Sequence, residues 1–286
     1  MKTFEQTLAL AESELTRDSE NCRPQQLYDL VAFKDTEHAP VVETFWRSSF
    51  QKLKTRALES GDLISEVVFD TLAHGIARWQ NRALAAALKD EFVFVVAEDD
   101  EIADEVPRHY ELGLTAGTVA LSMAALGYQG ELALFDSFLE SYEPRYAGED
   151  FVMRVRYAQW ILKGDEAGAL AYLTDPDHDK GLGLAACALA DLDARAALEP
   201  LKTIRKTLKN PVSVEVFTEA IQRLMKQGAP PAWSDRMIHL FGIMTPTECA
   251  LTGDDDNEFV LRARQVKSNP DLGRVHEVDD STQADR

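Results

Sequence analysis

The run from Asp175 to Asp179 is the first stretch of this sequence in which chemistry could be sought. Aspartates at 175, 177 and 179 match the opening of a calcium-binding loop, which also needs glycine at its sixth position and glutamate at its twelfth. Counted from Asp175, these two positions hold Lys180 and Ala186. The lysine would place a positive charge beside the ion, so we expect an acidic loop between helices and not a metal site.

The histidines and the short motifs offer no other site. No two of the six histidines stand four residues apart, the helical spacing that a HExxH zinc site requires. The chain also lacks the hydrolase GxSxG motif, the phosphate-binding loop and the dinucleotide-binding glycine pattern. Glu66 and Asp70 stand four apart, but this spacing is common on a solvated helix face of an acidic chain. We therefore expect no catalytic residues, no metal and no cofactor, and interpret the protein as a non-enzyme.

Composition limits the class of partner. The chain has 286 residues, 45% of them hydrophobic, which is enough for one large domain or two modest ones. Its 30 basic and 49 acidic residues give a formal net charge of -19. Such a surface repels phosphate backbones and anionic lipids, so we expect neither nucleic acid nor membrane as a partner. It would attract a basic protein, although solubility alone also explains the charge and is the favoured interpretation.

Cysteine usage and the N-terminus predict the compartment. Cys22, Cys187 and Cys249 lie far apart and form neither a disulfide framework nor a metal-binding spacing. Three reduced thiols suit a reducing cytosol. Acidic residues interrupt the first helix where a signal peptide would be apolar, and no run approaches the roughly 18 apolar residues of a membrane span. We therefore expect a soluble, cytoplasmic protein.

Apolar side chains recur at helical spacing through residues 1–105, which predicts an N-terminal helical region. A second long helix is expected from Asp62 to about Leu88. Phe92 to Val96 has the composition of a strand but no partner strand, so we expect a buried helix or a connector. The acidic run from Glu98 to Glu105 predicts a solvated linker. A strong helical stripe follows Pro40 and comprises Val42, Phe45, Trp46, Ser49, Phe50 and Leu53.

Residues 106–211 carry a small-residue helical pattern that restarts after each short turn, as stacked helical hairpins do. Gly127 and Gly164 should lie in turns between paired helices, where a left-handed backbone is needed. A third, alanine-rich unit lacks such a glycine and should turn at Asp191 to Asp193. The spacing is near the tetratricopeptide period of about 34 residues but degenerate, so an ordinary helical bundle remains an alternative. Either way, the fold class is all-α.

This order of elements resembles the small tetratricopeptide-like (TPR-like) proteins and chaperones of bacterial type III secretion systems. In those families a first hairpin ends at a proline, here Pro144, and a second has a Gly-Asp turn, here Gly164 and Asp165. A third hairpin contains an alanine-rich helix with a cysteine and a turn aspartate, here Cys187 and Asp191. The resemblance covers about residues 110–211. It implies a cytoplasmic chaperone whose concave face holds an aggregation-prone secreted subunit.

Function is therefore expected to lie in binding. The leading hypothesis is a chaperone or scaffold of a bacterial secretion system that holds a partner protein in a helical-repeat groove. The alternative is an acidic immunity or inhibitor protein that blocks the basic cleft of a bacterial toxin. For each candidate groove residue, packing in the core is favoured over contact with a partner. These candidates are Tyr128, Phe135, Tyr157, Trp160 and Tyr172.

The chain beyond residue 211 is expected to contain further helices and then a tail. Helical spacing from Val214 to Leu224, and again from Trp233 to Ile243, predicts C-terminal helices within residues 212–252. From Gly253 onward the composition becomes acidic and polar, so residues 253–286 are expected to form a disordered tail.

Overall fold

The computed structural model describes residues 3–16, 25–60, 81–102, 106–178 and 180–226, together with 72, 73, 75–77 and 79. Every regular element within these residues is helical, so the predicted all-α class is confirmed. The helix expected from Trp233 to Ile243 and the tail expected over residues 253–286 lie outside the described residues.

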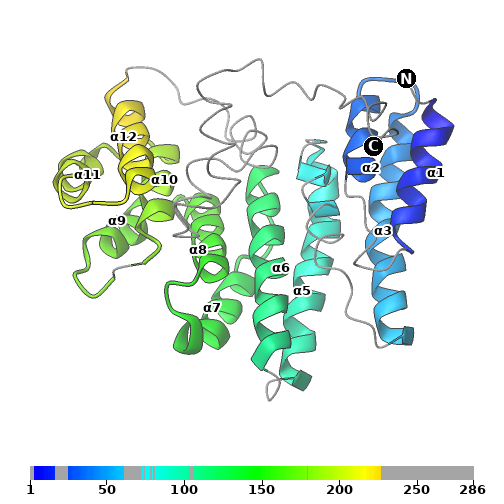
Figure 1. Cartoon of the computed structure of the whole chain (residues 1–286), viewed down its shortest axis with the longest axis horizontal. Helices are drawn as coiled ribbons and strands as arrows, with labels where there is room; N and C mark the ends of the chain where they lie inside the picture. The colour runs from blue at the N-terminus through cyan, green and yellow to red at the C-terminus, as the bar shows by residue number, and fades with distance from the viewer. Residues whose placement is uncertain are drawn as a thin grey trace, which may run out of the picture.

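Along the longest axis of the molecule, α1, α2 and α3 lie at one end, α5, α6 and α8 follow, and α9 to α12 are gathered at the other end (Figure 1). Short 3-10 turns at Asp29–Phe33, Arg82–Leu84 and Arg195–Ala197 precede α3, α5 and α11. The α-helices are α1 (Phe4–Glu14), α2 (Gln25–Tyr28), α3 (Ala39–Ser60), α5 (Ala85–Ile102), α6 (Val106–Ala125), α7 (Ala133–Tyr146), α8 (Asp150–Lys163), α9 (Glu166–Thr174), α10 (Leu182–Asp191), α11 (Leu198–Arg205) and α12 (Pro211–Met225).

The N-terminal helices form as their sequence predicts. α1 begins with a capping box, in which the Thr3 hydroxyl accepts from the Gln6 N–H and the Gln6 side chain accepts from the Thr3 N–H. In α3 every member of the apolar stripe predicted after Pro40 is buried, including Ser49. The Ser49 hydroxyl donates to the Phe45 carbonyl oxygen at 2.7 Å, which satisfies this polar group inside the core.

Helix α5 shows that two expectations were wrong. The helix predicted from Asp62 to Leu88 breaks at Asn81, which caps the next turn by accepting from the Ala83 N–H at 3.0 Å. The linker predicted over Glu98 to Glu105 is helical as far as Ile102, because the helix that begins at Ala85 continues through the acidic run. α5 also packs along α6, so the helix packing continues across residue 105.

From α6 onward the hairpins form a two-layer array. α6, α8, α10 and α12 lie in a row, each packed against the next, and α7, α9 and α11 each pack against the helix that follows them. The row helices begin at residues 106, 150, 182 and 211, so the spacing is irregular. Between Thr115 and Leu126 every residue of the α6 segment is buried, as expected for a helix enclosed on all sides.

The turns between the paired helices use the left-handed backbone. Gly127 and Gly164 have φ angles of 62° and 65°, which confirms the predicted role of both glycines. The third turn has no glycine, and Asp193 adopts the same conformation with φ 54°. Aspartate is one of the few other residues that tolerate this region. The third hairpin therefore turns where the sequence predicted, with an aspartate in the glycine's place.

Close approach of α6 and α8 depends on two glycines of α6. A Cβ on Gly117 would lie 3.0 Å from both the Cα and the carbonyl oxygen of Phe151. A Cβ on Gly113 would lie 2.6 Å from the Phe151 ring, which is itself fully buried. These two positions let α6 approach α8 closely enough for the helices to share one core.

The core consists of two clusters that meet at α8. The first extends from Ala11 to Ala158 and the second from Ala77 to Leu224, so both contain residues from each side of position 105. On α8, Phe151 and Val155 belong to the first cluster, whereas Tyr157 and Trp160 belong to the second. Among the described residues, no helix is both long and apolar enough to cross a membrane.

Candidate functional site

Four of the five aromatic residues proposed to line a groove are part of the core. The exposed fractions are 0% for Phe135, 2% for Tyr157, 2% for Trp160 and 7% for Tyr172. Tyr128 alone among the five is half-buried. The four buried side chains do not line an open groove in this structure, and the core-packing alternative describes them.

Contacts with other aromatic rings explain this burial. Phe135 meets Phe92 of α5 edge to face, with ring centroids 5.3 Å apart. Trp160 and Tyr172 join α8 to α9 with centroids 5.5 Å apart. Aromatic pairs at these distances add stabilisation beyond the area they bury. The aromatic pattern read from the sequence therefore marks where the hairpins are held together.

Tyr157 also belongs to a buried polar network that connects three helices of the row. Its hydroxyl donates to Asp191 Oδ2 at 2.5 Å, and the guanidinium of Arg223 on α12 contacts Asp191 Oδ1 at 2.6 Å. The Asp191 side chain is 1% exposed and that of Arg223 13% exposed. Asp191 was predicted only as a turn residue, because partners 34 and 32 residues away along the chain leave no local signal.

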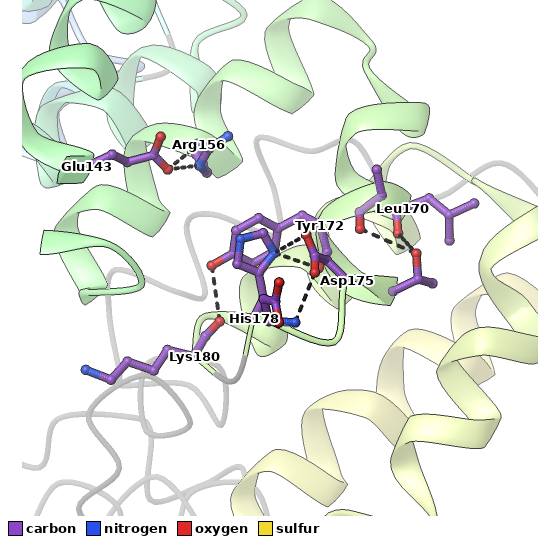
Figure 2. Close-up of polar contacts among 10 residues, drawn as sticks. Glu143, Arg156, Leu170, Tyr172, Asp175, His178 and Lys180 are labelled. Atoms are coloured by element: carbon purple, nitrogen blue, oxygen red, sulfur yellow. Dashed lines mark hydrogen bonds and ion pairs between the residues drawn. The ribbon is translucent and has the colours of Figure 1, made fainter.

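A polar and aromatic cluster near the surface surrounds Tyr172 at the end of α9 (Figure 2). The His178 ring stacks on the Tyr172 ring with centroids 3.9 Å apart and planes 14° apart. The Arg156 guanidinium lies over the Tyr172 ring at 5.7 Å and is ion-paired with Glu143 of α7. The Tyr172 hydroxyl donates to the Lys180 carbonyl oxygen at 3.2 Å. Together these contacts hold the α9–α10 loop against Tyr172 of α9 and connect Tyr172, through Arg156 of α8, to Glu143 of α7.

The carboxylate of Asp175 makes its contacts within the loop itself. Asp175 Oδ1 accepts from the Asp177 N–H at 2.9 Å, while Asp175 Oδ2 lies 3.7 Å from His178 Nδ1. His178 Nδ1 also lies 3.3 Å from the Tyr172 carbonyl oxygen. Asp179 lies outside the described residues. The described contacts are those of a hydrogen-bonded turn, and they orient the His178 ring for stacking on Tyr172.

Comparisons with known proteins found no relative of this chain. No protein family model, curated protein or solved structure matches it. The candidate site is therefore argued from its own residues, which include exposed charged groups. Exposed carboxylates stand on α7 at Glu140, on α9 at Glu166 and on the following loop at Asp175 and Asp177. We call these four residues the outer acidic surface.

Helix α11 adds a group of basic residues that the sequence interpretation overlooked. Lys202, Arg205, Lys206 and Lys209 lie in or directly after this helix. The available signal was the absence of any aspartate or glutamate from residue 200 to residue 214 in so acidic a chain. The exposed faces of the array thus carry charge of both signs, with the four cations gathered at α11 and just after it.

Proposed function

We propose that this protein is a scaffold that binds another polypeptide on the exposed faces of its helical array. The observation that carries the proposal is the difference in exposure between the two layers of the array. The row helices α8 and α10 are almost wholly buried, whereas α7, α9 and α11 present charged residues outward. An array of hairpins with charged outer faces gives an extended surface for a protein partner.

The narrower form of the proposal is a cytoplasmic chaperone of a bacterial secretion system, built on TPR-like stacking. It rests on the resemblance over residues 110–211 and is supported by the left-handed turns at Gly127, Gly164 and Asp193. Because Phe135, Tyr157, Trp160 and Tyr172 are occupied with packing, contact with the subunit is assigned to the outer faces. The chaperone would then hold its subunit mainly by charge complementarity.

A second candidate function, inhibition of a bacterial toxin, is favoured by the net charge of -19. An inhibitor of this kind blocks a basic active cleft with its acidic face, and association is steered by the electric field. The outer acidic surface would be the contact face. The two functions differ in the identity of the partner and not in the chemistry of recognition.

The test is chemical cross-linking and co-purification of the tagged full chain, with the partner identified by mass spectrometry. We expect one partner whose cross-links map to α7, α9 or α11, and whose retention falls as salt rises. Substituting Glu140→Lys with Glu166→Lys should reduce retention, whereas the matched exposed pair Glu12→Lys with Asp35→Lys should not. A secreted subunit as the partner supports the chaperone, and a toxin supports the inhibitor. Equal loss in both variants, or no specific partner, would overturn the proposal.

A further inference from the structure

The face presented by α11 has a charge opposite to that of the chain as a whole. Residues 200–214 contain Lys202, Arg205, Lys206 and Lys209 and no acidic residue, while the whole chain has a net charge of -19. We call these four residues the α11 basic surface. A local reversal of sign in a strongly acidic protein cannot be attributed to a need for solubility, which its net charge already provides.

The packing of α11 turns these cations outward. Leu201 is fully buried, and Leu198, Ile204 and Leu208 are partly buried against the second core cluster. Arg205, Lys206 and Lys209 are exposed. Among the described helices α11 packs chiefly on α12, at one end of the molecule (Figure 1). The face that carries the cations is therefore open to a partner within the described part of the chain.

Ion pairing with carboxylates distinguishes the cations of the α11 basic surface from those of α8. Every basic residue of α8 contacts a carboxylate: Arg154 meets Asp150, Arg156 meets Glu143 and Lys163 meets Asp136.

On the α11 basic surface, Lys202 alone has such a partner, since its ammonium group lies 2.8 Å from Glu199. Arg205 donates to the Thr218 hydroxyl at 2.6 Å, a neutral partner, and forms no ion pair with a carboxylate of the described residues. Neither Lys206 nor Lys209 has a carboxylate within ion-pair distance among the described residues. Arg205, Lys206 and Lys209 thus have no ion-pair partner among the described residues.

The field of these cations already acts on a carboxyl group of the same helix. The pKa of Glu199 lies below its ordinary value, first because Lys202 donates a hydrogen bond to it and then because of the Lys202 charge. The charge of Lys206 lowers the pKa further. A carboxylate brought to this face from another molecule would meet the same field.

We propose that the α11 basic surface docks an acidic segment of a partner polypeptide. This proposal rests on the function proposed above and adds a second kind of contact to it. A short segment touches the basic surface alone. At physiological salt the Debye length is about 8 Å, so repulsion from the more distant acidic faces is largely screened. A long nucleic acid would have to run past those acidic faces, and its affinity depends on many phosphate contacts. Charge complementarity therefore favours the peptide.

The experiment measures fluorescence anisotropy of a labelled octaglutamate peptide with the full chain. We expect saturable binding that weakens as salt rises from about 50 mM to about 200 mM. Lys206→Glu with Lys209→Glu should weaken binding about tenfold, through lost attraction and added repulsion. The control, Lys52→Glu with Arg145→Glu, has the same net charge change at exposed positions on α3 and α7 and should change affinity by less than about twofold. Thermal melts establish that both variants are folded.

Three results would overturn the inference. The first is equal weakening in both double variants, which would show a response to net charge alone. The second is tighter binding of a single-stranded RNA of matched charge. The third is peptide binding that occurs only after Asp254, Asp255 and Asp256 are replaced by asparagine, which would assign the surface to the chain's own acidic segment. A partner could also co-purify equally well with the wild type and with the Lys206→Glu, Lys209→Glu variant. That result would support the scaffold function and reject this docking site.

Discussion

The carboxylate of Asp191 connects α8, α10 and α12 through Tyr157 and Arg223. Asp191→Ala would leave the Arg223 charge, which is 13% exposed, without this partner. We expect a loss of about 3 kcal/mol in the free energy of unfolding, because breaking a buried pair leaves an uncompensated charge. Tyr157→Phe removes one hydrogen bond and should cost about 1–2 kcal/mol. Urea unfolding followed by circular dichroism measures both.

A double variant distinguishes the ion pair from simple packing. Adding Arg223→Met to Asp191→Ala should recover part of the lost stability, since the unpaired charge is then removed as well. If the effects of the two substitutions simply add, the pair contributes nothing beyond its separate side chains.

Glu43 should make the free energy of unfolding depend on pH, and the direction of its pKa shift gives the sign of that dependence. Its pKa lies below the ordinary value because the Trp79 indole N–H donates to it, then because the Asn81 amide does, and the Arg47 charge adds to this. The folded state thus holds this proton less tightly than the unfolded chain does. The stabilisation is complete above the ordinary glutamate pKa of about 4.3 and is lost as pH falls through the folded value.

Glu43→Gln should therefore lower the free energy of unfolding by about 1 kcal/mol at neutral pH, by weakening the two charge-assisted hydrogen bonds. Urea unfolding of the wild type and the variant across the acidic range should show this difference shrinking as pH falls. A difference that stays constant with pH would assign the effect to shape and not to charge.

At the scale of the element, the approach of α6 to α8 is the tightest constraint. Gly117→Ala should lower the free energy of unfolding by about 1–3 kcal/mol, because the new methyl group would press on the Phe151 backbone. Helix propensity alone predicts the opposite sign, a gain of up to about 1 kcal/mol. Thermal or urea unfolding of this one variant therefore decides whether close helix approach or propensity governs the position.

The turn residues Gly164 and Asp193 give two contrasting predictions. Gly164→Ala should cost about 1 kcal/mol through backbone strain alone, because no atom lies within 4 Å of the added Cβ. Asp193→Gly should be neutral or slightly stabilising, since it relieves a φ of 54° at an exposed position. Melting temperatures of the two variants, compared with wild type, check this. A loss in Asp193→Gly matching that in Gly164→Ala would show that strain is not the cause.

The helices were predictable from the sequence where local periodicity determines them, and unpredictable where distant residues do. The stripe of α3 and the glycine turns are local signals, and both appear as predicted. The break at Asn81 depends on a single cap hydrogen bond, which periodicity does not reveal. Burial of Trp160 was favoured but not fixed by the sequence pattern, because spacing shows that a helix has an apolar face but not what covers it. The cations of α11 were visible in the sequence, but their lack of partners was not.

At the scale of the whole molecule, the shared core predicts that the repeat region will not fold alone. A fragment of residues 106–226 would lose Phe92, which packs against Phe135 and Phe138, and would expose the face of α6 that packs on α5. We expect it to bind the dye ANS and to melt without a cooperative transition. The full chain is the control. A fragment that melts sharply, near the temperature of the full chain, would show that a domain boundary lies at residue 105 after all.

The arrangement of helices in chain order has a consequence for synthesis. Because each row helix packs on the next one along the chain, most partners become available within a few dozen residues of each other. Folding rates rise as contacting residues lie closer in sequence, since less loop entropy is lost before contacts form. The array can therefore assemble progressively as it leaves the ribosome. Each new hairpin would find its predecessor already folded, and the basic helix α11 would be among the last parts to take its place.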